Sequence, residues 1–144
     1  MLNLDMEDYG GLYVGCAGGG DTTISIPLER KELPASLSEV IEIRVEGLMG
    51  GHSGLNIHEG RGNAVILCTR AVQMALQVAG EGNAALLSVC GGNKHNAIPR
   101  EAIAILAVEP SARNAVEKSV VACSKAFMDE FGLLEKGLAI KAKG

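Results

Sequence analysis

Apolar residues recur along the chain with two different periods, and each change of period marks the end of one expected element. Apolar Ile41, Ile43 and Val45 alternate with charged neighbours, which predicts a strand with one buried face. Other segments carry apolar residues at helical spacing or in nearly unbroken runs. Strands are therefore expected at residues 40–46, 84–90, 102–108 and 138–142, and helices at residues 64–78 and 111–131.

The order of these elements predicts the fold class. Strand, helix, strand, strand, helix, strand is the split order of ferredoxin-like domains. We expect an α+β two-layer sandwich, in which two helices cover one face of an antiparallel βαββαβ sheet. The apolar runs 84–90 and 102–108 are expected to be neighbouring central strands, and Ser111 is expected to cap the second helix. The other sheet face must then meet water, a partner or the segment before Pro34.

Extra N-terminal strands are expected ahead of this unit. Residues 12–17 form a short apolar piece between an acidic cluster and a run of glycines. Residues 22–30 alternate apolar and polar side chains, and Pro27 among them suits the edge of a sheet. Both segments are typical of short strands.

Composition and charge exclude several classes of partner. The net charge of the 144 residues is −4, and the 13 basic residues are scattered, so neither nucleic acid nor a membrane surface is an expected partner. Aromatic residues make up only 3%, which disfavours base stacking. No secretory signal is visible, and no apolar run approaches the roughly 20 residues that span a bilayer. The four cysteines form no Cys-x-x-Cys pair, so we expect free thiols and a cytoplasmic location.

His52 is the first candidate for chemistry. It lies among glycines, in Gly-Gly-His-Ser-Gly, between a strand and the coming helix. Loops held by a rigid sheet often present functional groups, and an imidazole here could donate a hydrogen bond to a developing oxyanion. A surface histidine beside a glycine turn is the alternative interpretation.

Other polar residues are weaker candidates. His58 could join His52 at a metal, but the spacing matches no compact zinc signature, which favours a structural role. Asn96, next to His95, could bind a substrate or only stabilise the turn before Pro99. The acidic cluster that begins at Asp5 offers hard oxygen ligands for a divalent cation, or forms a solvated turn.

Five stretches, in the same order, resemble the aminoacyl-histidine dipeptidases, a family of carnosinase-like metallopeptidases. Residues 2–8, Leu-Asn-Leu-Asp-Met-Glu-Asp, are similar to the family's N-[LT]-D-S-E-[DE] segment. Residues 13–19 resemble its Y-x-G-C-A-G-G strand, and residues 47–54 its G-L-K-G-G-H-S-G loop. Residues 57–64, Ile-His-Glu-Gly-Arg-Gly-Asn-Ala, and residues 96–102, Asn-Ala-Ile-Pro-Arg-Glu-Ala, match two more stretches.

The resemblance implies a function for the parent protein. Members are cytosolic homodimers in which two zinc ions hydrolyse dipeptides, typically with a C-terminal histidine, and an inserted lid domain forms the dimer. Residues 1–20 would be a remnant of the catalytic domain, and residues 21–144 the lid and dimerisation domain. Asp5 would be a metal ligand, His52 the lid histidine that stabilises the transition state in the partner's active site, and Asn96 a substrate-binding group.

The same resemblance implies that this chain alone is inactive. One carboxylate cannot hold a catalytic zinc, which needs about three protein ligands, so no cofactor is expected in the isolated chain. The alternative function is a free-standing ferredoxin-like module that binds a ligand or regulates a partner.

Overall fold

The computed structural model describes residues 8–16 and 18–144 and divides the chain into two compact units, Met1–Lys31 and Glu32–Gly144. In the first unit, the described residues form no helix or strand, and the Tyr13 hydroxyl donates to Asp8 over 2.5 Å. Strands were expected at residues 12–17 and 22–30. This prediction is wrong for residues 12–16 and 22–30, which form no strand, and residue 17 lies outside the described residues. A strand needs hydrogen bonds from a neighbouring strand, and no strand in the described part of the chain pairs with these segments. The domain boundary expected after residue 20 stays a prediction.

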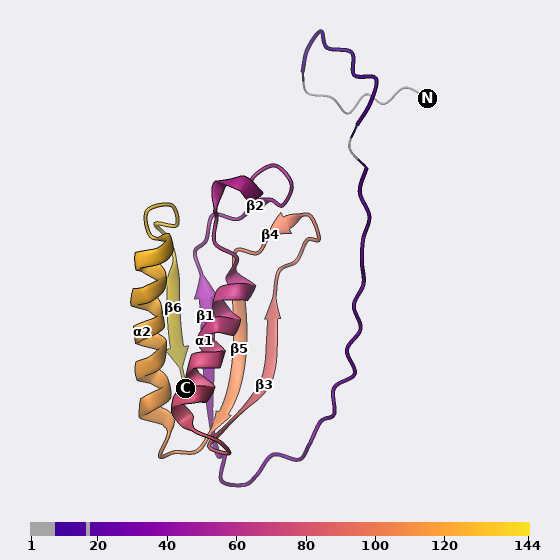
Figure 1. The fold of residues 1–144 in the computed structure, drawn as a ribbon. Helices are drawn as coiled ribbons and strands as arrows, with labels where there is room; N and C mark the ends of the chain where they lie inside the picture. The colour runs from indigo at the N-terminus through magenta and orange to yellow at the C-terminus, as the bar shows by residue number, and fades with distance from the viewer. Residues whose placement is uncertain (1–7, 17) are drawn as a thin grey trace. The chain divides into compact units, whose positions relative to one another are not determined.

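The second unit is a four-stranded antiparallel sheet with two helices (Figure 1). The strand order β3-β5-β1-β6 puts β1 between β5 and β6, as expected for a ferredoxin-like domain. The predicted fold class is confirmed, and the strands outside the main sheet are a two-stranded ribbon of β2 and β4. The elements are β1 (Glu39–Glu46), β2 (Gly51–His52), a 3-10 turn (Ile57–Glu59), α1 (Ala64–Ala79), β3 (Ala84–Gly91), β4 (Ala97–Ile98), β5 (Ala102–Val108), α2 (Arg113–Phe131) and β6 (Ala139–Lys143).

The core lies between this sheet and the helices. Ile41, Ile43 and Val45 of β1 are completely buried, as their alternation predicts. Ile43 is paired with Ala104 of β5, which is also fully buried. The charged residues between them lie on the opposite face, where Arg44 pairs with Glu42 at 3.0 Å. That part of the uncovered face is charged, which is why it can meet water.

Strand β3 occupies one edge of the sheet, not its centre. The predicted pairing of residues 84–90 with 102–108 is confirmed, but of these two strands β5 has a neighbour on both sides and β3 on one side. Six of the eight residues of β3 are exposed. The apolar run could not distinguish a buried strand from an apolar edge, because both lack polar alternation.

The two helices pack against each other as well as on the sheet. Asn63 caps α1, since its side-chain oxygen accepts from the backbone N–H groups of Val65 and Ile66. The cap expected at Ser111 is wrong: α2 begins at Arg113, and the preceding turn is closed by Ala112, whose N–H donates to Glu109. No helix among residues 8–16 and 18–144 is long and apolar enough to cross a membrane.

Candidate functional site

The β2–β4 ribbon brings two predicted site segments together at one end of the sheet (Figure 1). His52 of β2 is paired with Ala97 of β4, the residue after Asn96. Beside this pair, the N–H of Ser53 donates to the carbonyl oxygen of Asn96 over 2.9 Å. The backbones that carry His52 and Asn96 are therefore adjacent, although 44 positions separate them (96 − 52 = 44).

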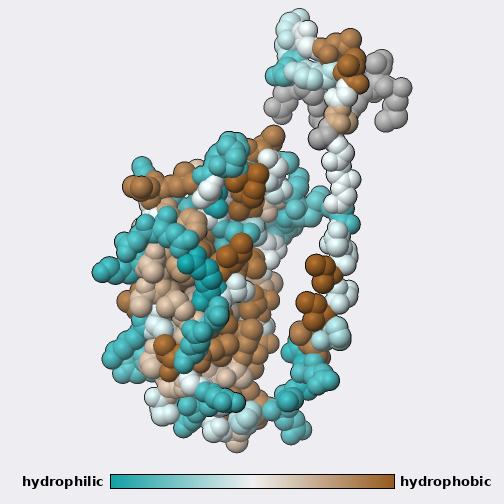
Figure 2. Space-filling model, in the orientation of Figure 1, coloured by the Kyte–Doolittle hydropathy of each residue, from teal (hydrophilic) through white to brown (hydrophobic). Residues whose placement is uncertain are grey.

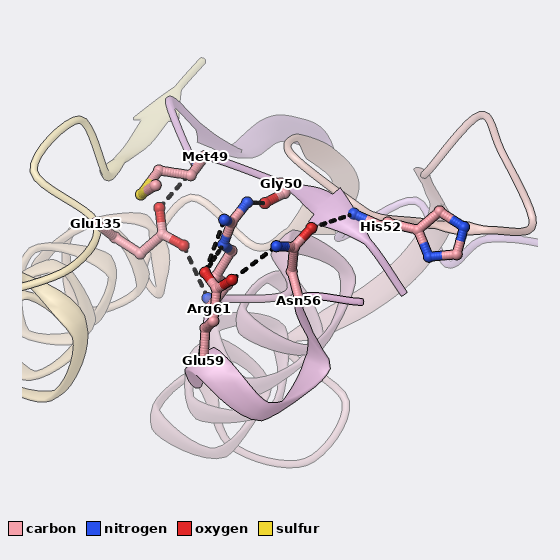
Figure 3. A network of polar contacts seen from close by, with 8 residues as sticks. Met49, Gly50, His52, Asn56, Glu59, Arg61 and Glu135 are labelled. Atoms are coloured by element: carbon pink, nitrogen blue, oxygen red, sulfur yellow. Dashed lines mark hydrogen bonds and ion pairs between the residues drawn. The ribbon is translucent and has the colours of Figure 1, made fainter. Parts of the chain in front are cut away.

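The His52 ring is exposed, and its orientation is set by the backbone that follows it. Nδ1 accepts two hydrogen bonds, from the N–H of Gly54 at 3.1 Å and from the N–H of Leu55 at 3.2 Å. A nitrogen that accepts cannot also carry the proton, so in the neutral ring Nε2 is the donor. The ring points away from the surrounding polar contacts (Figure 3), which leaves Nε2 available to a group outside this unit.

A network of charged and amide side chains supports the His52 loop, which we define as residues 49–62. The Asn56 side-chain oxygen accepts from the N–H of His52 over 2.8 Å, and its amide nitrogen donates to Glu59 over 2.7 Å. Arg61 pairs with Glu59 and donates to the carbonyl of Gly50 (Figure 3). The pKa of the Glu59 carboxyl is lowered by the hydrogen bond from Asn56 and then by Arg61. Each side chain of the network is thus bound to the loop or to another member.

Glycine is required at position 51 for this arrangement. Its φ is +144°, a backbone conformation that residues other than glycine rarely adopt. A β-carbon there would lie 2.5 Å from a guanidinium nitrogen of Arg61 and 2.8 Å from the side-chain oxygen of Asn56. The glycine cluster seen in the sequence therefore lets the network approach the backbone beside His52.

Glu135, which no pattern in the sequence marks, lies at the base of the His52 loop. Its side chain is completely buried between the turn after α2 and the loop. One carboxylate oxygen accepts from the N–H of Met49 over 2.7 Å, and the other accepts from the N–H of Gly62 over 2.9 Å (Figure 3). No local periodicity signals such a residue, because its partners are distant in sequence.

A groove of about 560 Å³ lies beside the ribbon. It is lined by backbone and side chains of β4, the turn before it and the ends of β3 and β5. Arg44, Arg100 and Glu101 supply its charged groups, and Ile98 supplies an apolar wall. The groove gives the site a concave surface with both signs of charge.

The other predicted candidates lie in exposed turns or outside the described residues. His58 lies in the 3-10 turn and is exposed, and the nearby Asn56 and Glu59 are engaged in the network. His95 is exposed in the turn before β4. Asp5 falls outside the described residues. Among residues 8–16 and 18–144, no group of three or more histidine, cysteine, aspartate or glutamate side chains could hold a metal ion.

A family model described as a peptidase dimerisation domain, of the M20 group, matches residues 43–131. The chain belongs to this family. The matched residues begin in β1 and end with α2, so they include the His52 loop and the network around it. The resemblance noted in the sequence is confirmed for this dimerisation domain.

Relatives of this dimerisation domain include proteins named as dipeptidases. The chain is 38% identical, over 97% of its length, to the cytosol non-specific dipeptidase of Escherichia coli K12, and covers 28% of that protein. It resembles the structure of the aminoacylhistidine dipeptidase of Vibrio alginolyticus with a TM-score of 0.68 and 29% identity, over 81% of this chain and 23% of that one. The chain thus spans about a quarter of the length of these relatives.

More distant structures share the fold of this dimerisation domain. An amidase of the hydantoinase/carbamoylase family from Burkholderia multivorans matches with a TM-score of 0.56 at 13% identity, over 72% of this chain and 26% of that chain. At that identity the likeness shows the fold alone.

Proposed function

We propose that this chain is the lid and dimerisation domain of a cytoplasmic dipeptidase that hydrolyses dipeptides with a C-terminal histidine. The family supports a role in dimerisation, and the names of the two dipeptidase relatives support the reaction class. Strand β3 is the observation that carries the dimerisation, and the exposed ring of His52 supports a role in the reaction.

The free edge of β3 is the proposed homodimer interface. Leu86 and Val89, opposite Leu106 and Ala104, lie on the helix-covered face of the sheet. They are 46% and 37% exposed, and brown surface follows this side of the unit in Figure 2. An apolar edge strand with unpaired backbone groups favours pairing with another strand. A two-fold axis would pair β3 with β3 of a second copy and extend the sheet across both.

Sedimentation velocity of this chain tests the interface. We expect a dimer whose dissociation constant rises when Leu86 and Val89 are both replaced by lysine. Each substitution removes apolar burial worth about 1.5 kcal/mol or more, so each should weaken the dimer about tenfold. Val121→Lys makes the same chemical change on α2, at a side chain that is 71% exposed, and should leave the dimer intact. A wild-type monomer at all concentrations would refute the proposal.

His52 is proposed to act in the active site of the partner subunit. During peptide hydrolysis the scissile carbonyl oxygen gains negative charge, and an N–H group positioned beside it stabilises the transition state. The Nε2 proton of His52 is a suitable donor, because Nδ1 is already occupied by two backbone N–H groups. Asn96, whose backbone is bound to Ser53, is proposed to contact the same substrate through its side chain.

Turnover measurements on the full-length dipeptidase test this role. His52→Ala should lower kcat about 100-fold, the usual cost of losing such a donor, without changing metal content. His58→Ala is the matched control, since it removes an exposed imidazole six residues away and should leave kcat unchanged (58 − 52 = 6). Wild-type turnover in His52→Ala would remove His52 from the mechanism.

The metal centre is proposed to lie outside the described residues. The parent enzyme would contain two zinc ions, with Asp5 as one ligand, but the described part of the chain does not fit such a site. The isolated chain is expected to release no histidine from Xaa-His dipeptides even with added zinc, as a ninhydrin-type amine assay can check. In the full-length enzyme, comparison of Xaa-His with Xaa-Leu dipeptides tests the preference, and equal kcat/KM values would contradict it.

A further inference from the structure

Glu135 is a buried carboxylate with an uncommon set of partners. Its exposed fraction is zero, and none of the ion pairs found in the described part of the chain includes it. Instead, each of its oxygens accepts one backbone N–H, from Met49 and from Gly62. Burying a carboxylate is costly unless it is hydrogen-bonded, so the turn after α2 must pack where the N–H groups of Met49 and Gly62 can donate to Glu135.

The two amides belong to opposite ends of the His52 loop. Met49 is its first residue and Gly62 its last, so a single carboxylate connects both ends to the segment between α2 and β6 (Figure 3). Gly62 allows the close approach: a β-carbon there would lie 2.8 Å from the Leu48 side chain and 3.5 Å from that of Glu135. The width of the loop at its base is therefore set by the separation of the two carboxylate oxygens.

The remaining contacts transmit this geometry to the imidazole. Arg61, next to Gly62, donates to the carbonyl of Gly50, and Asn56 accepts from the N–H of His52. Beyond them, the N–H groups of Gly54 and Leu55 bind Nδ1 of the ring. These contacts connect the base of the loop to the backbone groups that orient the ring.

We propose that Glu135 is a positioning residue for His52. Glu135 forms no hydrogen bond with the ring and acts by holding both ends of the loop. The N–H groups of Gly54 and Leu55 then stay bound to Nδ1, so that the proton remains on Nε2 and the orientation of the ring is kept. The catalytic consequence rests on the proposed function of His52, whereas the structural consequence can be measured without it.

Glu135→Gln is the informative variant. A glutamine has one acceptor oxygen, and its NH₂ group would face an N–H, so one of the two loop ends is released. A displacement of about 1 Å in a catalytic group can lower turnover about 100-fold, so kcat should fall at least about tenfold while KM changes little. Glu130→Gln is the matched control: it makes the same change at an exposed carboxylate near the end of α2, which binds Arg70 and not the loop.

Nitrogen-15 NMR of the histidine side chains in this chain gives the direct test. In the wild type and in Glu130→Gln, the neutral His52 ring should carry its proton on Nε2, and the amides of Gly54 and Leu55 should exchange slowly. In Glu135→Gln we expect a mixture of the two neutral tautomers and faster exchange of both amides. If the variant does not fold, Glu135→Asp, which keeps the charge but is one methylene too short to reach both amides, should show the same changes. Unchanged His52 signals in a folded variant at position 135 would overturn the proposal.

A double-mutant cycle in the full-length enzyme separates this proposal from that for His52. If Glu135 acts through His52, the double variant His52→Ala and Glu135→Gln should turn over as slowly as His52→Ala alone. Independent, multiplying losses would overturn the positioning role. If His52→Ala itself keeps wild-type turnover, the proposed function fails, and the NMR result still decides whether Glu135 orients the ring.

Discussion

Replacing Gly51 with alanine should destabilise this protein more than the same replacement at Gly60. Both glycines have positive φ, +144° and +70°, so alanine is strained at either position. At Gly60 an added β-carbon meets nothing within 4 Å, whereas at Gly51 it meets Arg61 and Asn56 at 2.5 and 2.8 Å. Gly60→Ala therefore measures the backbone cost, and Gly51→Ala adds the cost of displacing the two side chains.

The magnitudes follow from those contacts. Alanine in the left-handed conformation costs about 1–2 kcal/mol, which is the whole effect expected for Gly60→Ala. At Gly51 the backbone cost is about 1–3 kcal/mol. Displacing Asn56 from the N–H of His52 adds about 1 kcal/mol, and displacing the charged Arg61 from the carbonyl of Gly50 adds about 1.5 kcal/mol or more. Gly51→Ala should thus lower the free energy of unfolding by about 3 kcal/mol or more.

Urea unfolding measures both losses. All variants are compared at one protein concentration, because a dimer makes the apparent stability depend on it. Hydrogen exchange of the Ser53 amide, which is bound to the carbonyl of Asn96, reports the loop itself and should quicken more in Gly51→Ala. Equal losses in the two variants would refute the reasoning, since the side-chain network would then contribute nothing at Gly51.

Three further outcomes are expected. Phe127 is 2% exposed and lies beneath the guanidinium of Arg70, so Phe127→Ala should lower the free energy of unfolding in urea by about 3–5 kcal/mol. The exposed Val121→Ala should lower it by less than about 0.5 kcal/mol, and equal effects would mean that α2 is not packed as described. The pKa of Glu59 is lowered in the folded protein, so Glu59 contributes fully to stability above its pKa in the unfolded chain, and this contribution is lost as the pH falls through its pKa in the folded protein. In a carbon-13 titration the pKa of Glu59 should rise in Asn56→Ala, and an unchanged pKa would contradict this cause. Burial raises the pKa of the Cys68 thiol to about 11, so a thiol reagent at pH 8 should modify the exposed cysteines first, and rapid reaction of Cys68 in the folded protein would count against its burial.

Much of the fold was readable from local patterns. The alternation at Ile41, Ile43 and Val45 predicted the face of β1 that is buried, because each side chain of a strand points opposite to the next. The apolar stripes predicted both helices, and the order of elements predicted the ferredoxin-like sandwich. The glycines around His52 marked its loop as a candidate site, and the quoted stretches indicated the peptidase family that the comparisons confirm.

Other features depended on which segments meet in three dimensions. The apolar run of β3 was expected at the centre of the sheet, and only the strand pairing shows that it forms an edge. Likewise, Asn96 and His52 come together because β2 and β4 pair, a contact that neither segment encodes alone.

The sequence by itself determined the elements, their buried faces and the residues offered for chemistry, because periodicity and turn composition act over a few neighbouring positions. Tertiary structure alone decided the role of Glu135, whose two hydrogen bonds span 86 and 73 positions to Met49 and Gly62. Its burial depends on how the turn after α2 packs against the His52 loop. A local sequence pattern cannot predict such a contact, because the residues next to Glu135 in the sequence are not the residues that it binds.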